Sequence, residues 1–224
     1  MLAVNEIFGP TIQGEGKNLG MPCAFLRLAG CNLKCLWCDT KYTWDWTQYN
    51  PRDEIHPMTV EAVRAQLTAL PVRNLVISGG EPMLQQPELS VLTEQLHRAG
   101  WWTEIETAGT IAPVSAELVN QFTVSPKLAS SGNGRERYNP AALDALVNTG
   151  RAIFKFVVCS LDDFDEIDPL VTRHKMQRVY VMPEGVDASR LNEKTQEFVT
   201  AAVARGYWIA SRLHIQLYGQ RRKI

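Results

Sequence analysis

The sequence predicts an α/β fold, a partial (open) TIM-like barrel of about six parallel strands that forms a single domain over residues 1–224. Three observations support this prediction. Short apolar runs recur along the chain, and each is followed by a polar turn and then by a helical pattern. Several of the runs are apolar almost throughout, as is typical of parallel strands that are covered on both faces. The units are also too few to close an eight-stranded barrel.

The apolar runs predict the strands, which right-handed crossovers would join into one parallel sheet. They lie at residues 24–28, 74–78, 103–107, 122–125, 152–158 and 178–182, with a weaker candidate at 207–211. The carboxyl ends of such strands meet at one rim, where ligands bind. Polar or glycine-rich segments follow five of the runs, so the sequence predicts an active site at this rim.

Helical patterns lie between the strands and begin near residues 58, 87, 139, 160 and 187. Asn139 is a predicted N-cap, and Gly150 and Gly206 are predicted stop signals. Ser160 is expected to begin its helix, with Asp163 three residues later as a variant of the capping box.

Two stretches carry neither pattern. They cover residues 41–58 and the Gly/Ser/Asn-rich segment 129–139. Both are predicted to be active-site loops, because binding residues concentrate on loops that a rigid scaffold positions.

Composition argues against several classes of protein. Hydrophobic residues make up 45% of the chain and the formal net charge is −1, so no global field attracts nucleic acid or an anionic membrane. No apolar run approaches the ~20 residues of a membrane span, and nothing at the N-terminus resembles a secretion signal. A cytoplasmic protein is therefore expected. The basic cluster 220–224 is predicted to be a solvated tail, and His214 a structural histidine.

Three of the five cysteines are crowded into the loop after the first predicted strand. Cys31, Cys35 and Cys38 suit Zn²⁺ or an iron–sulfur cluster. A Cys₃His zinc site that recruits a distant histidine stays open, as do three unligated core cysteines. A [4Fe–4S] cubane ordinarily takes four cysteines, so three would leave one iron with an exchangeable site.

This loop carries a resemblance to a known superfamily. The spacing Cys31-x₃-Cys35-x₂-Cys38, with Trp37 between the last two cysteines, matches the signature of radical S-adenosylmethionine enzymes. In that superfamily the unique iron binds S-adenosylmethionine, which is cleaved to a 5′-deoxyadenosyl radical. The run "SGGEP" at 78–82 resembles the superfamily's GGE motif, whereas in isolation it would read as a tight turn.

Further motifs narrow the resemblance to the 7-carboxy-7-deazaguanine synthases. The runs at 5–16 and 25–44 are similar to that family, and "IETAGT", "TVSPK" and "VMPEG" follow in order. The likeness extends to about residue 185. The segment 211–224 resembles the family's closing strand only in outline, because its residues differ from the family's usual motif. The resemblance therefore does not say which contacts this segment makes.

The resemblance implies a site, which is listed here by role. The implied cluster ligands are Cys31, Cys35 and Cys38, and the implied Mg²⁺ ligand is Thr40. The implied S-adenosylmethionine contacts are Trp37, Cys38, Asp39, Gly80, Glu106, Ser125, Pro126, Lys127, Met182, Pro183 and Glu184. The implied substrate contacts are Ile12, Gln13, Gly14, Glu15, Arg27 and Ser78.

For some of these residues, roles other than ligand binding stay open. A hairpin turn would explain residues 13–16, and an ion pair inside the barrel would explain Arg27. Thr40 could be a turn hydroxyl, and Met182 could be a core residue. No residue is singled out as a general acid or base.

The resemblance also implies the reaction and the partners. The enzyme would be a lyase that converts 6-carboxy-5,6,7,8-tetrahydropterin to 7-carboxy-7-deazaguanine with loss of ammonia, a step toward queuosine. Hydrogen abstraction from the substrate would lead to ring contraction, and S-adenosylmethionine would be regenerated. An external one-electron reductant such as flavodoxin or ferredoxin and a homodimer are implied, with no direct nucleic-acid or membrane partner. A glycyl-radical activase and a non-catalytic zinc or redox-sensing module are the alternatives.

Overall fold

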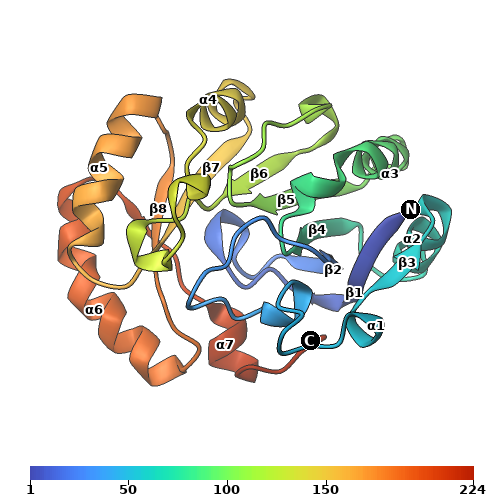
Figure 1. Cartoon of the computed structure of the whole chain (residues 1–224), viewed down its shortest axis with the longest axis horizontal. Helices are drawn as coiled ribbons and strands as arrows, with labels where there is room; N and C mark the ends of the chain where they lie inside the picture. The colour runs from blue at the N-terminus through green and yellow to red at the C-terminus, as the bar shows by residue number, and fades with distance from the viewer.

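The computed structural model describes residues 1–224 and contains one nine-stranded sheet, in the order β3-β1-β2-β4-β5-β6-β7-β8-β9 (Figure 1). Seven of these strands pair in parallel with one another, and all seven predicted runs are strands. They are β2 (Pro22–Leu28), β4 (Asn74–Gly79), β5 (Trp102–Thr107), β6 (Gln121–Val124), β7 (Ala152–Val158), β8 (Val179–Pro183) and β9 (Trp208–Ile209). The sheet does not close on itself, so the α/β class and the partial, open barrel are confirmed.

Two antiparallel strands at one edge were not predicted. β1 (Leu2–Ile12) pairs with β2, and β3 (His56–Met58) pairs with β1. β1 contains Gly9 and Pro10 and has register shifts between Val4 and Glu6 and between Phe8 and Thr11. Those interruptions remove the continuous apolar pattern by which the other strands are recognised.

The predicted helices are present between the parallel strands. They are α2 (Val60–Thr68), α3 (Gln86–Arg98), α4 (Pro140–Asn148), α5 (Asp163–His174) and α6 (Ala188–Ala204), and they lie along the outer side of the curved sheet (Figure 1). Asn139 caps α4 by accepting a hydrogen bond from the amide of Ala142. Gly150 and Gly206 follow their helices with φ of +66° and +71°, as the stop signals predicted. No helix of the chain is both long and apolar enough to cross a bilayer.

The prediction for the start of α5 was wrong. The helix begins at Asp163, and Ser160 lies in the turn before it. The Asp163 carboxylate accepts hydrogen bonds from the amides of Cys159, at 2.6 Å, and Ser160, at 3.3 Å. The predicted bond from the Asp163 carboxylate back to the chain is therefore present, but the Ser160 hydroxyl does not cap the helix.

The segment 41–58 is less irregular than predicted, because it contains α1 (Pro51–Glu54) and the edge strand β3. The segment 129–139 has only two short 3₁₀ turns, as its composition predicts.

The segment after β9 also differs from the prediction. Leu213–Tyr218 form a helix, α7, instead of a closing strand. The basic residues beyond it are more than a solvated tail, because Arg222 bonds Glu6 and Glu54 and its guanidinium lies 3.8 Å from the centre of the Tyr42 ring. Figure 1 shows α7 and the C-terminus on the side of the barrel that the outer helices leave open.

The two faces of the parallel strands differ in chemistry, since successive side chains point to opposite sides. The outward side chains, such as Phe154 and Phe156 of β7, join a core of 32 buried residues beneath the helices. The alternate side chain, Lys155, points to the inner face, as do Arg27 of β2 and Glu106 of β5, which line a cavity. The expectation of cover on both faces is therefore wrong for the inner face, where charged side chains line a cavity beside a small apolar cluster.

Candidate active site

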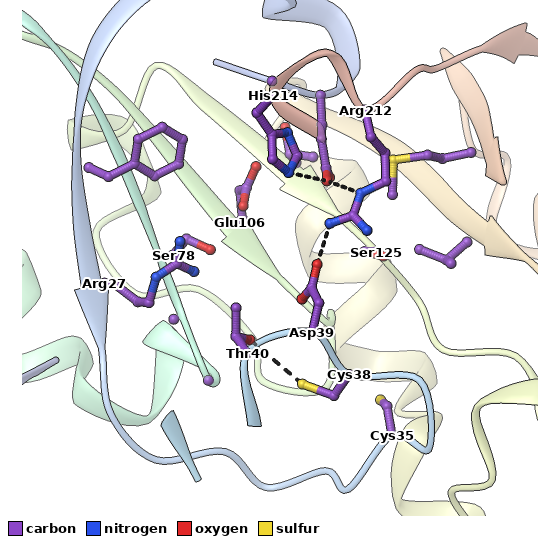
Figure 2. Close-up of a pocket in the computed structure, with 18 of the residues that line it drawn as sticks. Arg27, Cys35, Cys38, Asp39, Thr40, Ser78, Glu106, Ser125, Arg212 and His214 are labelled. Atoms are coloured by element: carbon purple, nitrogen blue, oxygen red, sulfur yellow. Dashed lines mark hydrogen bonds and ion pairs between the residues drawn. The ribbon is translucent and has the colours of Figure 1, made fainter. Parts of the chain in front are cut away.

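A cavity of about 270 Å³ lies at the carboxyl ends of the parallel strands, on the inner face of the open barrel. Figure 2 shows the loop that carries Cys35 and Cys38 on one side of it, Arg27 on a second, and His214 on a third. Strand ends, the cysteine loop and the C-terminal segment therefore converge on one site, at the rim where the sequence predicts it.

The turn after β4 fixes the start of the cysteine loop. The amide of Gly80 donates to the carbonyl oxygen of Leu28 at 2.9 Å, and the amide of Glu81 donates to that of Gly30 at 2.8 Å. A Cβ atom on Gly80 would lie only 2.0 Å from the Gly30 oxygen and 3.0 Å from the Cβ of Cys31. The site therefore requires glycine because two backbone segments meet there.

The buried Glu81 carboxylate secures the same turn to the end of β5. It accepts hydrogen bonds from the Thr107 hydroxyl at 2.8 Å, the Ala108 amide at 2.7 Å and the Met83 amide at 3.1 Å. Burial raises the pKa of Glu81 above its usual range although these bonds oppose the shift. Its role is to hold the rim together, and it does not line the cavity.

The three thiols of the loop all line the cavity. Burial raises the pKa of Cys31 to about 11 and also raises that of Cys35. These thiols therefore need a bound cation to ionise. No group of three or more His, Cys, Asp or Glu side chains converges as the ligands of one metal ion would, which argues against the zinc alternative. A cluster binds each thiolate to a different iron, so the donor set fits an iron–sulfur cluster.

A network of paired charges forms the wall opposite the cysteine loop. Glu15 forms ion pairs with Lys155 and with Arg212, whose Nε donates to the carboxylate at 2.9 Å. Arg212 also pairs with Asp39 and donates to the carbonyl oxygen of Gly185 at 2.6 Å. Burial alone would raise the pKa of Glu15, but Lys155 and Arg212 hold it well below its usual range. Glu15 therefore stays ionised inside the barrel.

Arg27 is the exception to this pairing. It lines the cavity from β2 and forms no ion pair, and its buried Nε atom has no hydrogen-bond partner. Its guanidinium lies 6.0 Å from the centre of the Phe8 ring. The alternative of an ion pair inside the barrel is therefore wrong, and the chain presents a free cation to the cavity.

The side of the cavity near β5 and β6 carries further polar groups. Gln13 donates from Nε2 to the carboxylate of Glu106 at 3.2 Å. Lys127 donates to the hydroxyl of Ser125 at 3.0 Å, and its ammonium lies 5.8 Å from the centre of the Trp37 ring. Burial lowers the pKa of Lys127. The buried indole N–H of Trp37 has no partner, so this side also has an unused donor.

Almost all of the predicted site residues line the cavity. From the N-terminal segment and β2 these are Ile12, Gln13, Gly14, Glu15 and Arg27. From the cysteine loop they are Cys31, Cys35, Trp37, Cys38, Asp39 and Thr40. From the later strand ends they are Ser78, Gly80, Glu106, Ser125, Lys127, Met182, Pro183 and Glu184. Pro126 is the exception, because it is buried and does not line the cavity.

The lining residues that were not predicted include Lys155, Arg212 and His214. A charged residue inside the apolar run 152–158 was the available signal for Lys155, because only a polar inner face accommodates it. His214, which was predicted to be structural, lines the cavity. Its Nε2 lies 3.9 Å from the Glu15 carboxylate, and burial lowers its pKa, so the imidazole is neutral at pH 7. A Cβ atom on Gly14 would lie 2.1 Å from the His214 ring, which explains that glycine.

Arg212→Met is expected to lower the free energy of unfolding by about 3 kcal/mol, because Glu15 and Asp39 lose a buried partner. Denaturant unfolding at pH 7 measures the change. The pKa of Glu15 is lower in the folded chain than its ordinary value of 4.5. The stabilisation that it supplies is therefore present above that value and is lost as the pH falls below it, so the difference from wild type shrinks in acid.

The matched control for this prediction is Arg205→Met. Arg205 forms an ion pair with Asp168 at 2.8 Å, but 32% and 40% of the two side chains are exposed. A pair of this kind contributes about 0–1 kcal/mol. Equal losses in the two variants would show that the network around Glu15 does not stabilise the fold.

The chain is similar to known proteins in both sequence and fold. Residues 26–182 match the family model described as the Radical SAM superfamily. The chain is 37% identical over 225 residues to the 7-carboxy-7-deazaguanine synthase of Pyrobaculum aerophilum, covering 98% of this chain and 96% of that one. It is 34% identical to the synthase of the same name from Halobacterium salinarum, covering 97% and 90%. The crystal structure of QueE from Escherichia coli superimposes with a TM-score of 0.75 at 29% identity, over 95% of this chain and 94% of that one.

Proposed function

The chain belongs to the 7-carboxy-7-deazaguanine synthases of the Radical SAM superfamily, and from this membership we propose which of its residues serve the cofactors and the substrate. The enzyme is a lyase that converts 6-carboxy-5,6,7,8-tetrahydropterin to 7-carboxy-7-deazaguanine with release of ammonia, within queuosine biosynthesis. The similarity extends over nearly the whole chain, which argues against the glycyl-radical activase and against the zinc or redox-sensing module.

A [4Fe–4S] cluster and S-adenosylmethionine supply the reducing electron and the carbon radical that the reaction requires. The proposed cluster ligands are Cys31, Cys35 and Cys38, which line one wall of the cavity. The protein binds and orients the reactants and excludes water from them, as is usual where cofactors carry the difficult chemistry.

The proposed S-adenosylmethionine site runs from the cysteine loop along the ends of β4, β5, β6 and β8. Its polar groups are chosen for their position and chemistry. Glu106 offers a carboxylate to ribose hydroxyls, Ser125 and Lys127 offer donors to ribose and carboxylate oxygens, and Trp37 offers a flat ring. The unpartnered indole N–H of Trp37 supports this assignment. The remaining proposed contacts are Cys38, Asp39, Gly80, Met182, Pro183 and Glu184.

The proposed pterin site lies opposite, between β1, β2 and α7. The observation that carries it is the unpaired guanidinium of Arg27, whose Nε atom is buried without a partner. A cation in such a place needs an anion, and the pterin brings a carboxylate. Ser78 lies beside Arg27 in the parallel register of β2 and β4 and offers a hydroxyl. Ile12, Gln13 and Gly14 form the adjacent wall.

Glu15 is proposed to recognise the opposite end of the pterin. Its two cationic partners keep it ionised, and an ionised carboxylate accepts hydrogen bonds from the N–H groups of an amidine edge. The neutral imidazole of His214 lies next to it and offers a further donor or acceptor.

Thr40 is the proposed protein ligand of Mg²⁺. Its hydroxyl lies 3.6 Å from the Sγ atom of Cys38 and lines the cavity between the cysteine loop and Arg27 (Figure 2). Mg²⁺ prefers oxygen ligands and commonly takes few from the protein, so the substrate carboxylate would supply others. Asp39 is occupied by Arg212, which leaves Thr40 as the available oxygen of this pair.

Thr40→Ala is expected to raise the Mg²⁺ concentration that half-maximal activity requires by about tenfold, because one direct ligand is lost. Initial rates over a Mg²⁺ titration measure this. Thr110→Ala is a control, because Thr110 bonds Asn32 and does not line the cavity. An unchanged Mg²⁺ dependence in Thr40→Ala would remove Thr40 from the metal site.

The proposed function is tested by anaerobic reconstitution. The purified chain is reconstituted with iron and sulfide and supplied with a reductant, S-adenosylmethionine and Mg²⁺. It is expected to form 7-carboxy-7-deazaguanine from the carboxytetrahydropterin. Chromatography and mass spectrometry measure the product. Substrate that returns unchanged from protein carrying a full cluster would contradict the substrate assignment.

We further propose that the enzyme acts in the cytoplasm as a homodimer and receives its electron from an external donor such as flavodoxin or ferredoxin. The dimer is an expectation from the family resemblance alone. The five unpaired cysteines support a reducing compartment. Sedimentation and reduction by purified flavodoxin would test these points.

A further inference from the structure

Each of the three cluster cysteines receives one N–H hydrogen bond at its sulfur atom. The amide of Leu33 lies 3.4 Å from the Sγ of Cys31. The side chains of two distant residues serve the others: Nδ2 of Asn133 lies 3.2 Å from the Sγ of Cys35, and Nε1 of Trp44 lies 3.3 Å from the Sγ of Cys38.

Asn133 comes from the irregular segment 129–139, to which the proposed function assigns no role. Its Oδ1 accepts from the amide of Lys34 at 2.7 Å. Because a backbone amide only donates, the oxygen must face Lys34, and the NH₂ group therefore faces Cys35. The same NH₂ group also donates to the Ser131 hydroxyl at 3.1 Å.

The segment around Asn133 is tied to the cysteine loop at more than this one point. The amide of Leu36 donates to the carbonyl oxygen of Ser131 at 2.9 Å. A Cβ atom on Gly132 would lie 2.6 Å from the Leu36 side chain. The contacts at Lys34 and Leu36, which flank Cys35 in the chain, therefore fix the distance between the Asn133 amide and the Cys35 sulfur.

Trp44 follows the cysteine loop and is held by its own backbone, whose amide donates to the Lys41 carbonyl at 3.0 Å. An indole N–H is only a donor, and the Cys38 sulfur is its partner. Trp44 and Asn133 therefore act on different thiolates.

From these contacts we propose that Asn133 and Trp44 are positioning residues that raise the reduction potential of the cluster. The inference rests on the assignment of Cys31, Cys35 and Cys38 as its ligands. Hydrogen bonds to ligand sulfurs stabilise negative charge, and the reduced cluster carries one more electron than the oxidised one, so each donor favours reduction.

The test is an EPR-monitored redox titration of the reconstituted holoenzyme. Trp44→Phe keeps an aromatic ring and removes the N–H, and Asn133→Leu removes the amide at similar size. In each variant the ratio of reduced to oxidised cluster at a fixed potential is expected to fall about tenfold, a downward shift of about 59 mV for a one-electron couple. The double variant is expected to show the sum, because the bonds reach different sulfurs.

Matched controls exist for both variants. Asn32→Leu replaces an asparagine beside Cys31 whose amide donates to Thr110 at 2.9 Å instead of to a sulfur. Trp46→Phe replaces an exposed tryptophan two residues after Trp44. Both controls are expected to keep the wild-type midpoint. Midpoints of Trp44→Phe and Asn133→Leu that equal these controls would overturn the proposal.

A second measurement avoids reliance on the variants, since either could assemble less cluster. Wild-type protein labelled with ¹⁵N in its tryptophan indoles or asparagine amides is expected to show a ¹⁵N coupling to the reduced cluster in pulsed EPR. The absence of both couplings would overturn the proposal. A wild-type chain that holds no cluster or makes no deazaguanine would instead contradict the proposed function, so the two failures are distinguishable.

Discussion

Cys35→Ala is expected to lose the iron–sulfur cluster and all formation of 7-carboxy-7-deazaguanine. Two remaining thiols hold a cubane poorly, and the radical that starts the reaction depends on it. Cys35 is buried at the cavity wall. The other two cysteines of the chain, Cys23 and Cys159, do not line the cavity, so neither is placed to substitute. Iron and sulfide content after anaerobic reconstitution, together with the visible absorption, measures the loss.

Cys159→Ala is the control for this prediction, because Cys159 lies at the end of β7 outside the cavity. It is expected to keep its iron and its activity. Full iron content in Cys35→Ala would falsify the ligand assignment.

Arg27→Met is expected to lower kcat/KM by about 10²–10³-fold with little change in stability. A substrate carboxylate left without its cation in a buried site loses about 2–5 kcal/mol. The free chain loses no ion pair, because Arg27 forms none. Activity and stability therefore separate at this residue, whereas Arg212→Met is expected to change both. Steady-state kinetics beside denaturant unfolding measures the two quantities.

Arg27→Lys distinguishes charge from geometry. Lysine keeps the charge but offers no bidentate pairing, so an intermediate kcat/KM is expected. An Arg27→Met variant with wild-type kcat/KM would contradict the carboxylate site, and one that unfolds readily would instead point to a structural role.

The sequence predicted those parts of the fold that local patterns determine. Each parallel strand is a short apolar run, and Asn139 or Gly150 marks a helix end through its own side chain or backbone. β1 escaped prediction because Gly9, Pro10 and two register shifts interrupt its pattern. Its existence depends on pairing with β2, which no window of sequence contains.

The site residues also fall into two groups, those in local sequence motifs and those that depend on distant contacts. The cysteine loop and the glycine turn were found because each is a contiguous motif. Arg212 was missed because its partners Glu15 and Asp39 lie 197 and 173 residues away in sequence. Nothing near Arg212 in the chain shows that it enters a cavity. The same separation hid the orientation of His214, which depends on contact with Gly14.

The open barrel has a consequence for how copies of the chain behave in a crowded solution. A sheet that does not close leaves two edges whose backbone groups could pair with another chain and seed aggregation. Here the edge strand β3 has three residues, one of them Pro57, and the opposite edge strand β9 has two. Edge strands this short have few backbone groups with which another chain could pair, and proline lacks the N–H that continued pairing needs. The open barrel therefore leaves its cavity accessible to ligands without exposing a long strand edge to other chains.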